Sequence, residues 1–324
     1  MRPTTTRIAA LVVTCACACA LLLAASCRPT DTDEPPPAPP ATAAATRPAQ
    51  AVRQLTAHLR NNELEAFAIE AVPPRLHARL QVAWKEGRTR WPLDALPFGR
   101  RLPAMLHALA EPGSEAKLQQ AFDRQFAGAN RELRSAATTL GQFGAQYIAS
   151  DAAGYSADER QHYAQLVAAA SQWAAKAPLG DRERARASIV QLAAAARRVR
   201  LASADDFRDA GMVASLRRIG PFAAALKQSL LRYGLDIDGG LGALDASLQR
   251  QTGDHATVRM RYRFAGQDID TTVSLERIAG RWYLSDYLRE AEAAASAPPP
   301  KAVPGRGTTR KPAAGAARRS PSRP

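Results

Sequence analysis

Residues able to do chemistry are sparse in this chain, and their spacing does not assemble them into a known catalytic pattern. No two of the five histidines are three or four residues apart, so none forms a helical pair of metal ligands. The carboxylate pairs Asp158–Glu159 and Asp205–Asp206 stand at the starts of expected helices, where helix capping accounts for them. Motifs for a serine nucleophile elbow, a zinc protease or a phosphate loop do not occur. The sequence therefore predicts a protein that is not an enzyme and that holds no metal or cofactor.

Two further segments have residue types that suit ligand binding. The run Asp236–Gly240 begins like a calcium loop, but its twelfth place is Ser247 where such a loop has glutamate, so we interpret it as a turn between helices. Trp84 and Trp91 flank a short basic stretch and could stack on a carbohydrate, although tryptophans packed in a core are the more common arrangement.

Cys27 is the remaining reactive residue, and the segment before it has the layout of an export signal. Arg2 and Arg7 give a positive start, an apolar stretch follows over residues 8–23, and two small residues precede the cysteine. This order predicts a cleaved signal peptide over residues 1–26. The other three cysteines lie within that segment, so its removal would leave Cys27 alone and the mature chain without an internal disulfide.

The residues Leu-Ala-Ala-Ser-Cys at 23–27 resemble the lipobox of bacterial lipoproteins, apart from Ala24 at the place where the family prefers leucine. The resemblance implies that Cys27 receives a diacylglyceryl group and becomes the first residue of the mature chain. Arg28 is not the aspartate that retains lipoproteins at the inner membrane, so the resemblance also implies an anchor in the inner leaflet of the outer membrane, facing the periplasm. A secreted protein with an incidental cysteine and an uncleaved membrane anchor are the alternatives.

Low-complexity segments flank the expected folded body. Residues 27–50 are rich in proline, alanine and threonine, which predicts an extended tether between lipid and body. Residues 297–324 predict a disordered basic tail. The formal charge of +14 suits a polyanion, and in this compartment that is lipopolysaccharide or peptidoglycan rather than nucleic acid. The tail residues expected to contact it are Arg306, Arg310, Lys311, Arg318 and Arg319.

Residues 51–252 predict a helical bundle. Apolar residues, many of them alanines that allow close helix packing, recur at three- and four-residue spacing over 133–148, 163–174, 189–199 and 222–233. Capping boxes at expected helix starts have the spacings Ser156/Glu159, Ser203/Asp206 and Asn62/Glu65.

The apolar period changes to two after Gly253, which predicts a three-stranded antiparallel meander over residues 253–296, packed on the helices. The fold class is therefore α+β, predominantly α. With Ala265-Gly266 as a two-residue turn, the paired residues are Tyr262/Ile269, Arg263/Asp268 and Arg261/Asp270, and a second turn places Trp282 opposite Arg277. Because this register gives the arginines carboxylate partners, we interpret the charged face as a solvated surface.

The last strand, Gly280–Leu284, resembles the final strands of NTF2-like and cystatin-like domains. The resemblance implies a sheet that encloses a pocket lined by Tyr262 and Trp282. We therefore expect a non-catalytic lipoprotein that binds an envelope protein or polymer. A carrier of a small apolar ligand in such a pocket, and a hydrolase of an envelope substrate, are the alternatives.

Overall fold

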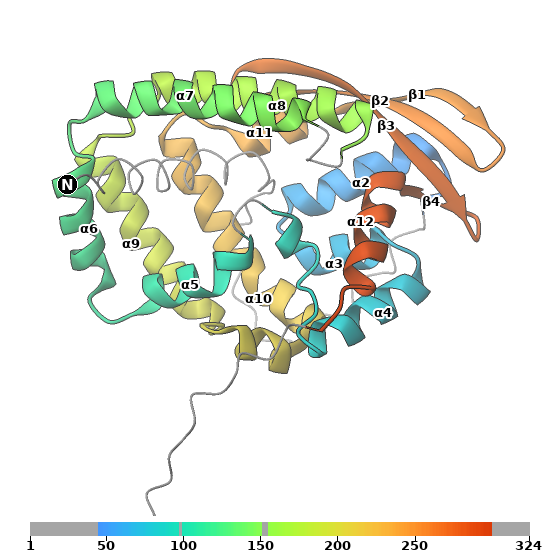
Figure 1. Cartoon of the computed structure of the whole chain (residues 1–324), viewed down its shortest axis with the longest axis horizontal. Coiled ribbons are helices and arrows are strands. Elements are labelled where there is room, and N and C mark those ends of the chain that lie inside the picture. Colours follow the sequence, from blue (N-terminus) through green and yellow to red (C-terminus); the bar gives the residue numbers. More distant parts are fainter. Residues whose placement is uncertain (1–44, 97–98, 151–154, 300–324) are drawn as a thin grey trace, which may run out of the picture.

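The computed structural model describes residues 45–96, 99–150 and 155–299 (Figure 1). Within these ranges helices form most of the chain and the strands form one small antiparallel sheet, which confirms the predominantly α, α+β fold class. In chain order the elements are α2 (Pro48–Arg60), α3 (Leu64–Glu70), α4 (Pro74–Lys85), η1 (Leu93–Ala95), η2 (Gly99–Arg101), α5 (Leu102–Ala110), α6 (Ser114–Gln125), α7 (Asn130–Ala149), α8 (Ala157–Lys176), α9 (Arg182–Val199), α10 (Ala204–Arg232), α11 (Ile237–Gly242), β1 (Asp245–Thr252), β2 (His255–Phe264), β3 (Gln267–Ile278), β4 (Arg281–Leu284) and α12 (Ser285–Ala295).

The sheet is a meander in the order β1-β2-β3-β4, one strand more than the sequence predicts. The additional strand, β1, lies in the region assigned to helices. It buries Ala246 alone and has a bulge between Leu248 and Arg250, so it lacks the apolar alternation that marks β2 and β3. The prediction of three strands was wrong for that reason.

The expected register of the other strands is confirmed, with the pairs Tyr262/Ile269, Arg263/Asp268, Arg261/Asp270 and Arg277/Trp282. The backbone geometry of the β2–β3 turn explains how an Ala-Gly pair can form it. Ala265 and Gly266 have φ angles of 53° and 79°. Two consecutive residues with positive φ are typical of a type I′ turn, whose twist matches that of the strands it joins.

Helices cover the inner face of the sheet and extend away from it (Figure 1). α2, α11 and α12 pack against the strands, α8 lies along β3, and α9 and α10 pack together in the helical part. Most buried apolar side chains from α2 through α12 form one cluster, so the sheet and the helices share a core, and Phe126 and Leu133 form a smaller second cluster. None of the helices in the described ranges combines the length and the apolar character needed to cross a bilayer.

Two of the three expected capping boxes are present. The Ser156 hydroxyl accepts from the Glu159 amide, the Ser203 hydroxyl accepts from the Asp206 amide, and each acidic side chain accepts from the serine amide in return. The third is wrong, because Asn62 has a φ of 55° and α3 has no side-chain cap.

Two segment boundaries also differ from those expected. Helix α2 begins at Pro48, and the carbonyl of Ala45 accepts a hydrogen bond from the Trp282 amide at 3.3 Å. The folded body therefore includes the end of the 27–50 segment that the sequence assigns to the tether. After β4, helix α12 occupies the last part of the segment assigned to the meander.

Candidate functional site

The residues expected to contact membrane or polyanion, namely Cys27, Arg306, Arg310, Lys311, Arg318 and Arg319, lie outside the described residues. The two expected pocket residues are described, and both are buried. The Tyr262 hydroxyl on β2 shares a hydrogen bond of 2.6 Å with Nε2 of His162 on α8. Trp282 on β4 borders a cavity of about 10 Å³, room for roughly one water molecule. Tyr262 and Trp282 therefore do not line a common pocket.

The other two segments with ligand-binding residue types have structural roles. Trp84 and Trp91 are buried in the core, and Nε1 of Trp84 donates to the Phe207 carbonyl at 2.8 Å. Asp236 begins α11 by accepting from the Gly239 amide at 2.8 Å, so this segment is a turn between α10 and α11. Across residues 45–96, 99–150 and 155–299, no group of three or more His, Cys, Asp or Glu side chains is placed to hold a metal ion.

The outer face of the sheet is densely charged and internally neutralised. Arg259 donates to Asp270 (2.8 Å from Nε to Oδ1) and Arg261 donates to Asp245 at 2.6 Å. Arg263 lies 3.4 Å from Asp268. The sequence assigns Asp270 to Arg261, but β1 supplies Asp245 for that arginine, which frees Asp270 for the diagonal neighbour. The hydrogen bond from Arg259 holds the pKa of the Asp270 carboxyl below its ordinary value.

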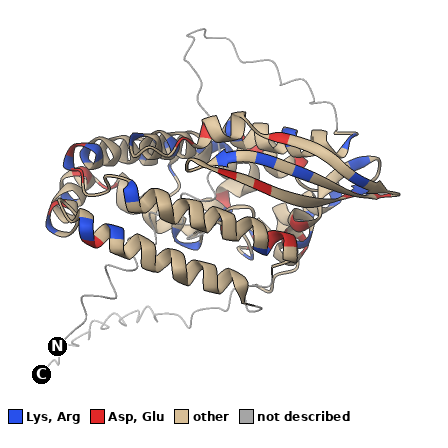
Figure 2. Ribbon diagram, turned by 90° about the horizontal axis from the view of Figure 1, so that it is seen from above, with Lys and Arg blue, Asp and Glu red and all other residues tan. Residues whose placement is uncertain are grey.

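The exposed side of the α7–α8 hairpin carries no charge. Residues 135–150 and 161–175 contain no Asp, Glu, Lys or Arg, in a chain that is 23% charged overall. Figure 2 shows the consequence, since both ribbons are tan along their middles and coloured near their ends. Phe143 and Tyr147 on α7 are 63% and 57% exposed, more than any other large apolar side chain among the described residues. We call the exposed side chains of residues 138–147 and 161–168 the uncharged hairpin surface.

Small residues bring the two helices of this hairpin close together. A Cβ atom added to Gly141 would lie 2.6 Å from the Cβ of Ser171, and one added to Gly144 would lie 3.1 Å from Cγ1 of Val167. The Ser171 hydroxyl donates to the Ala137 carbonyl at 3.0 Å. α7 makes its main contacts with α8, so its remaining sides stay open to solvent.

Helix α8 is in turn fixed to the sheet through a backbone-like contact. The Gln165 side chain accepts from the Asp270 amide at 3.0 Å and donates to the Asp270 carbonyl at 2.9 Å. Its amide group thus takes the place of a neighbouring strand along the part of β3 that the short β4 does not reach. These two hydrogen bonds attach α8, and through it the hairpin, to the edge of β3.

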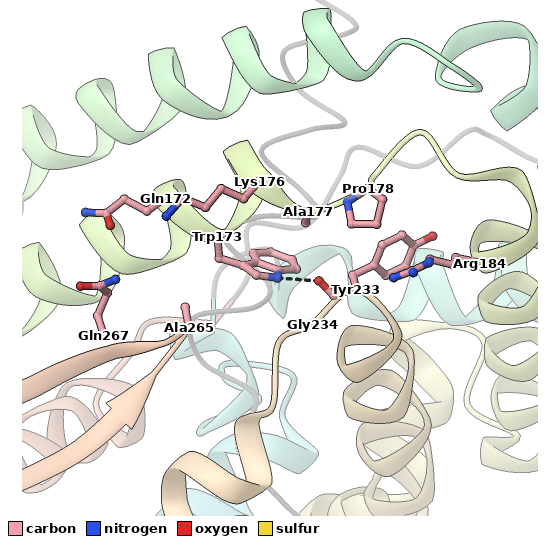
Figure 3. A pocket seen from close by; sticks show the side chains of 10 residues that line it. All are labelled: Gln172, Trp173, Lys176, Ala177, Pro178, Arg184, Tyr233, Gly234, Ala265 and Gln267. Atoms are coloured by element: carbon pink, nitrogen blue, oxygen red, sulfur yellow. Dashed lines mark hydrogen bonds between the residues drawn. The ribbon is translucent and has the colours of Figure 1, made fainter.

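An open pocket of about 360 Å³ lies where the end of α8 meets α9, α10 and the β2–β3 turn (Figure 3). In Figure 3 the Trp173 indole lies at its centre, with Gln172 and Gln267 on one side and Arg184 on the other. Nε1 of Trp173 donates to the Tyr233 carbonyl at 2.9 Å. The lining includes two cations, Lys176 and Arg184, and no carboxylate.

Besides the uncharged hairpin surface and the pocket, a third candidate region is a cluster of buried polar and aromatic side chains between α8, α12 and the sheet. The Tyr155 and Tyr163 ring centres are 4.8 Å apart. Arg289 on α12 donates to Glu159 and Asp286, both at 2.7 Å. Asp286 lies on α12 itself, so the contact with Glu159 is the one that joins α12 to the capping box that begins α8.

Burial dominates the electrostatics of this cluster. It lowers the pKa of His162 to about 4, so the imidazole is neutral near pH 7. Burial, and then the negative charge of Glu159, raise the pKa of Glu290 to about 7. Burial also raises the pKa of Tyr262, which keeps its proton in the hydrogen bond with His162. None of these groups lines the pocket of Figure 3.

Comparison with known proteins adds no external assignment: no family model, curated protein or solved structure significantly matches the chain. Function must therefore be inferred from these three regions. Sequence reasoning missed the uncharged hairpin surface, although the two charge-free stretches that signal it are readable in the sequence. It also missed the pocket, because its lining comes from segments that only the fold brings together.

Proposed function

We propose that this protein is a non-catalytic, membrane-anchored lipoprotein of the bacterial envelope, and that it binds another envelope protein through the uncharged hairpin surface. The observation that carries this proposal is the exposure of Phe143 and Tyr147 on a helix pair without a charged residue in its middle. The centres of protein interfaces are depleted of charge and enriched in aromatic residues. Solvent-exposed helix faces, in contrast, are normally charged.

The shape of the surface favours a helical partner. α7 has 20 residues, which at 1.5 Å per residue gives a ridge about 30 Å long. α8 has the same length and runs antiparallel beside it, so the hairpin presents two neighbouring helical ridges, and the exposed aromatic side chains belong to α7. A third helix packs on such ridges by the usual ridge-and-groove contacts, and an uncharged partner face leaves no ion unpaired.

Lipid is a poorer match for this surface than protein. Helices that lie on membranes carry lysine and arginine along their polar side, next to large apolar residues. Here the polar positions are glutamine and threonine, with basic residues near the ends of the hairpin only. We therefore commit to a protein partner, and vesicle binding becomes an outcome that the experiment must exclude.

Photo-crosslinking in cells tests the proposal. A benzophenone amino acid is placed at Phe143 or Tyr147, and at Val190 on α9 as a control that is also about half exposed (49%). We expect a discrete adduct of the same mass from both hairpin positions and not from position 190. The captured protein is then purified, and its affinity for the whole chain is measured directly.

Three results would contradict the proposal. An adduct of twice the chain mass would identify self-association, and flotation of the purified protein with vesicles would identify a lipid surface. Equal adducts from positions 143 and 190 would show that the hairpin has no special role.

The envelope location has its own test. Wild-type protein should incorporate labelled palmitate in cells and fractionate with membranes, whereas Cys27→Ser should incorporate none and should become soluble after cell lysis. Palmitate in the serine variant, or none in the wild type, would remove the anchor from this account but leave the hairpin interface to be judged separately.

The described residues give less support to a ligand carrier or a hydrolase. A carrier needs an enclosed apolar pocket, yet Tyr262 is occupied by His162 and Trp282 borders a cavity of water size. A hydrolase needs an accessible pair of catalytic groups, whereas the pocket of Figure 3 has no carboxylate, histidine or serine in its lining.

A further inference from the structure

The pocket of Figure 3 has hydrogen-bonding groups that no other described residue pairs with. Among the described residues, the side chains of Gln172, Lys176 and Gln267 make no hydrogen bond or ion pair. They project from two sides, since Gln172 and Lys176 belong to α8 and Gln267 follows the β2–β3 turn. At about 360 Å³, the pocket is near the small end of the range for ligand sites, about 300–1,000 Å³.

The local backbone is arranged so that the pocket stays positive. The C-terminal end of α10 would otherwise present unpaired carbonyls with partial negative charge. Nε1 of Trp173 donates to the Tyr233 carbonyl at 2.9 Å, and Nη1 of Arg184 donates to the Arg232 carbonyl at 2.5 Å. These two contacts satisfy the carbonyls and hold the Arg184 guanidinium at the rim of the pocket.

Asp181 forms an ion pair with Arg184 but accepts no hydrogen bond from its guanidinium group. Asp181 lies 3.7 Å from Nε, beyond hydrogen-bond distance, and its Oδ1 accepts from the Arg184 backbone amide at 2.9 Å as the cap of α9. The remaining guanidinium donors and Lys176 are therefore available to an anion. Arg259 and Arg261 on the sheet differ from Arg184, because each of them donates a hydrogen bond to a carboxylate.

We propose that this pocket binds an anionic saccharide, that is, a sugar ring with a carboxylate substituent. Lys176, which lies beside Gln172 in Figure 3, binds the carboxylate as a charge-assisted donor, and Arg184 on the other side of Trp173 donates to the far side of the sugar. The amides of Gln172 and Gln267 donate to and accept from the hydroxyl or acetamido groups of the ring, and the Trp173 indole supplies an apolar surface beside it. The site is separate from the uncharged hairpin surface, so it does not rest on the function proposed above.

Calorimetric titration of the whole purified chain tests this site with a matched pair of probes. N-acetylmuramic acid carries a carboxylate, and N-acetylglucosamine is the corresponding neutral sugar. We expect the acidic sugar to bind at least about tenfold more tightly than the neutral one, the size of effect expected for a charge-assisted hydrogen bond. Inorganic phosphate serves as the probe for a simple anion.

Variants then locate the site. Lys176→Gln and Arg184→Gln should each weaken binding of N-acetylmuramic acid by about tenfold. Arg186→Gln removes the same charge from the same helix, is exposed, and lies outside the lining, so it should bind as the wild type does. Lys176 is exposed and makes no hydrogen bond or ion pair within the described residues, so its variant should stay folded even if Arg184→Gln, which loses the Arg232 contact, does not.

Each other outcome overturns the proposal. Equal binding of the acidic and neutral sugars removes the role of the cations. Phosphate that binds as tightly as the acidic sugar removes the saccharide and leaves a general anion site. Loss of binding in Arg186→Gln as large as in Lys176→Gln places the ligand outside the pocket.

Discussion

The outer face of the sheet and the uncharged hairpin surface lie side by side on the side of the molecule seen in Figure 2, and they treat charge in opposite ways. On the sheet, arginines of β2 alternate with buried residues and each is matched by an aspartate of β1 or β3. On the hairpin, the corresponding exposed positions are alanine, threonine, glutamine and two aromatic residues.

The difference is that the charged groups of the sheet already have partners within the chain, whereas the aromatic groups of the hairpin are left exposed. The ion pairs of the sheet match each β2 arginine with a carboxylate in water, so these arginines offer little unmatched charge to a partner. The hairpin exposes two large aromatic side chains without a compensating charge nearby, which is costly for a surface that stays in water. A search for function by counting arginines would select the sheet, whereas the contacts favour the hairpin.

The largest effect is expected from placing a charge on the hairpin. Phe143→Asp should weaken binding of the crosslinked partner by about 100-fold, because truncating an aromatic hot spot typically costs 2 kcal/mol or more and the aspartate would in addition be desolvated. The free energy of unfolding should change by no more than about 0.5 kcal/mol, since the site is exposed. Val190→Asp on α9 is the matched control. A Phe143→Asp protein that keeps full affinity would transfer the interface to another surface.

A smaller loss should follow from separating the two helices of the hairpin. Gly141→Val inserts a branched side chain where Ser171 already fills the space, and overpacking of this kind costs about 1–3 kcal/mol. Because α7 packs mainly on α8, the cost should appear as local opening. Hydrogen exchange of α7 amides should accelerate while that of α9 and α10 stays unchanged. Ala145→Val, on the exposed side of α7, provides the control, and equal exchange in both variants would contradict the close packing.

A structural element could be predicted from the sequence where its pattern involves residues close together in the chain. The register of β2 and β3 follows from alternating side chains and a two-residue turn, and all its pairs are confirmed. The capping boxes of α8 and α10 are equally local. β1 fails because its bulge and its single buried residue remove the alternation, and the partner of Arg261 was wrong in consequence.

The candidate sites divide in the same way. The charge-free stretches could have been read directly, but only the structure shows that Phe143 and Tyr147 face solvent rather than the core. The pocket joins Lys176 to Arg184 and Gln267, residues from separate elements whose proximity no spacing rule predicts. The neutral state of His162 likewise depends on burial under the sheet, which periodicity cannot give.

The buried groups His162 and Glu290 should dominate the pH dependence of stability between pH 4 and 7. The native pKa of Glu290 is raised to about 7, so its ionisation lowers stability as pH rises from about 4.5 to 7. The native pKa of His162 is lowered to about 4, so stability falls as pH drops from 6.5 toward 4. Between pH 4.5 and 6.5 the two slopes oppose each other. Relative to wild type, Glu290→Gln should therefore gain about 1–3 kcal/mol as pH rises from 4.5 to 7.

The complementary variant sharpens this test. Relative to wild type, His162→Gln should gain stability as pH falls from 6.5 to 4.5, because the cost of keeping a neutral imidazole is removed. Urea denaturation of both variants and the wild type at four pH values between 4.5 and 7.5 measures the slopes. Parallel curves for all three proteins would show that neither buried group controls the pH dependence.

The smallest effect is expected on the outer face of the sheet. The Arg261 and Asp245 side chains are 57% and 53% exposed, so a double-mutant cycle with alanine at both positions should give a coupling free energy of about 0.2–1 kcal/mol. Raising the ionic strength should reduce it, since exposed pairs are screened. Affinity for the hairpin partner should not change, because the pair satisfies itself. If Arg261→Ala weakened that affinity as much as Phe143→Asp, the partner would extend across the sheet, and the distinction between a self-matched and an open surface would fail.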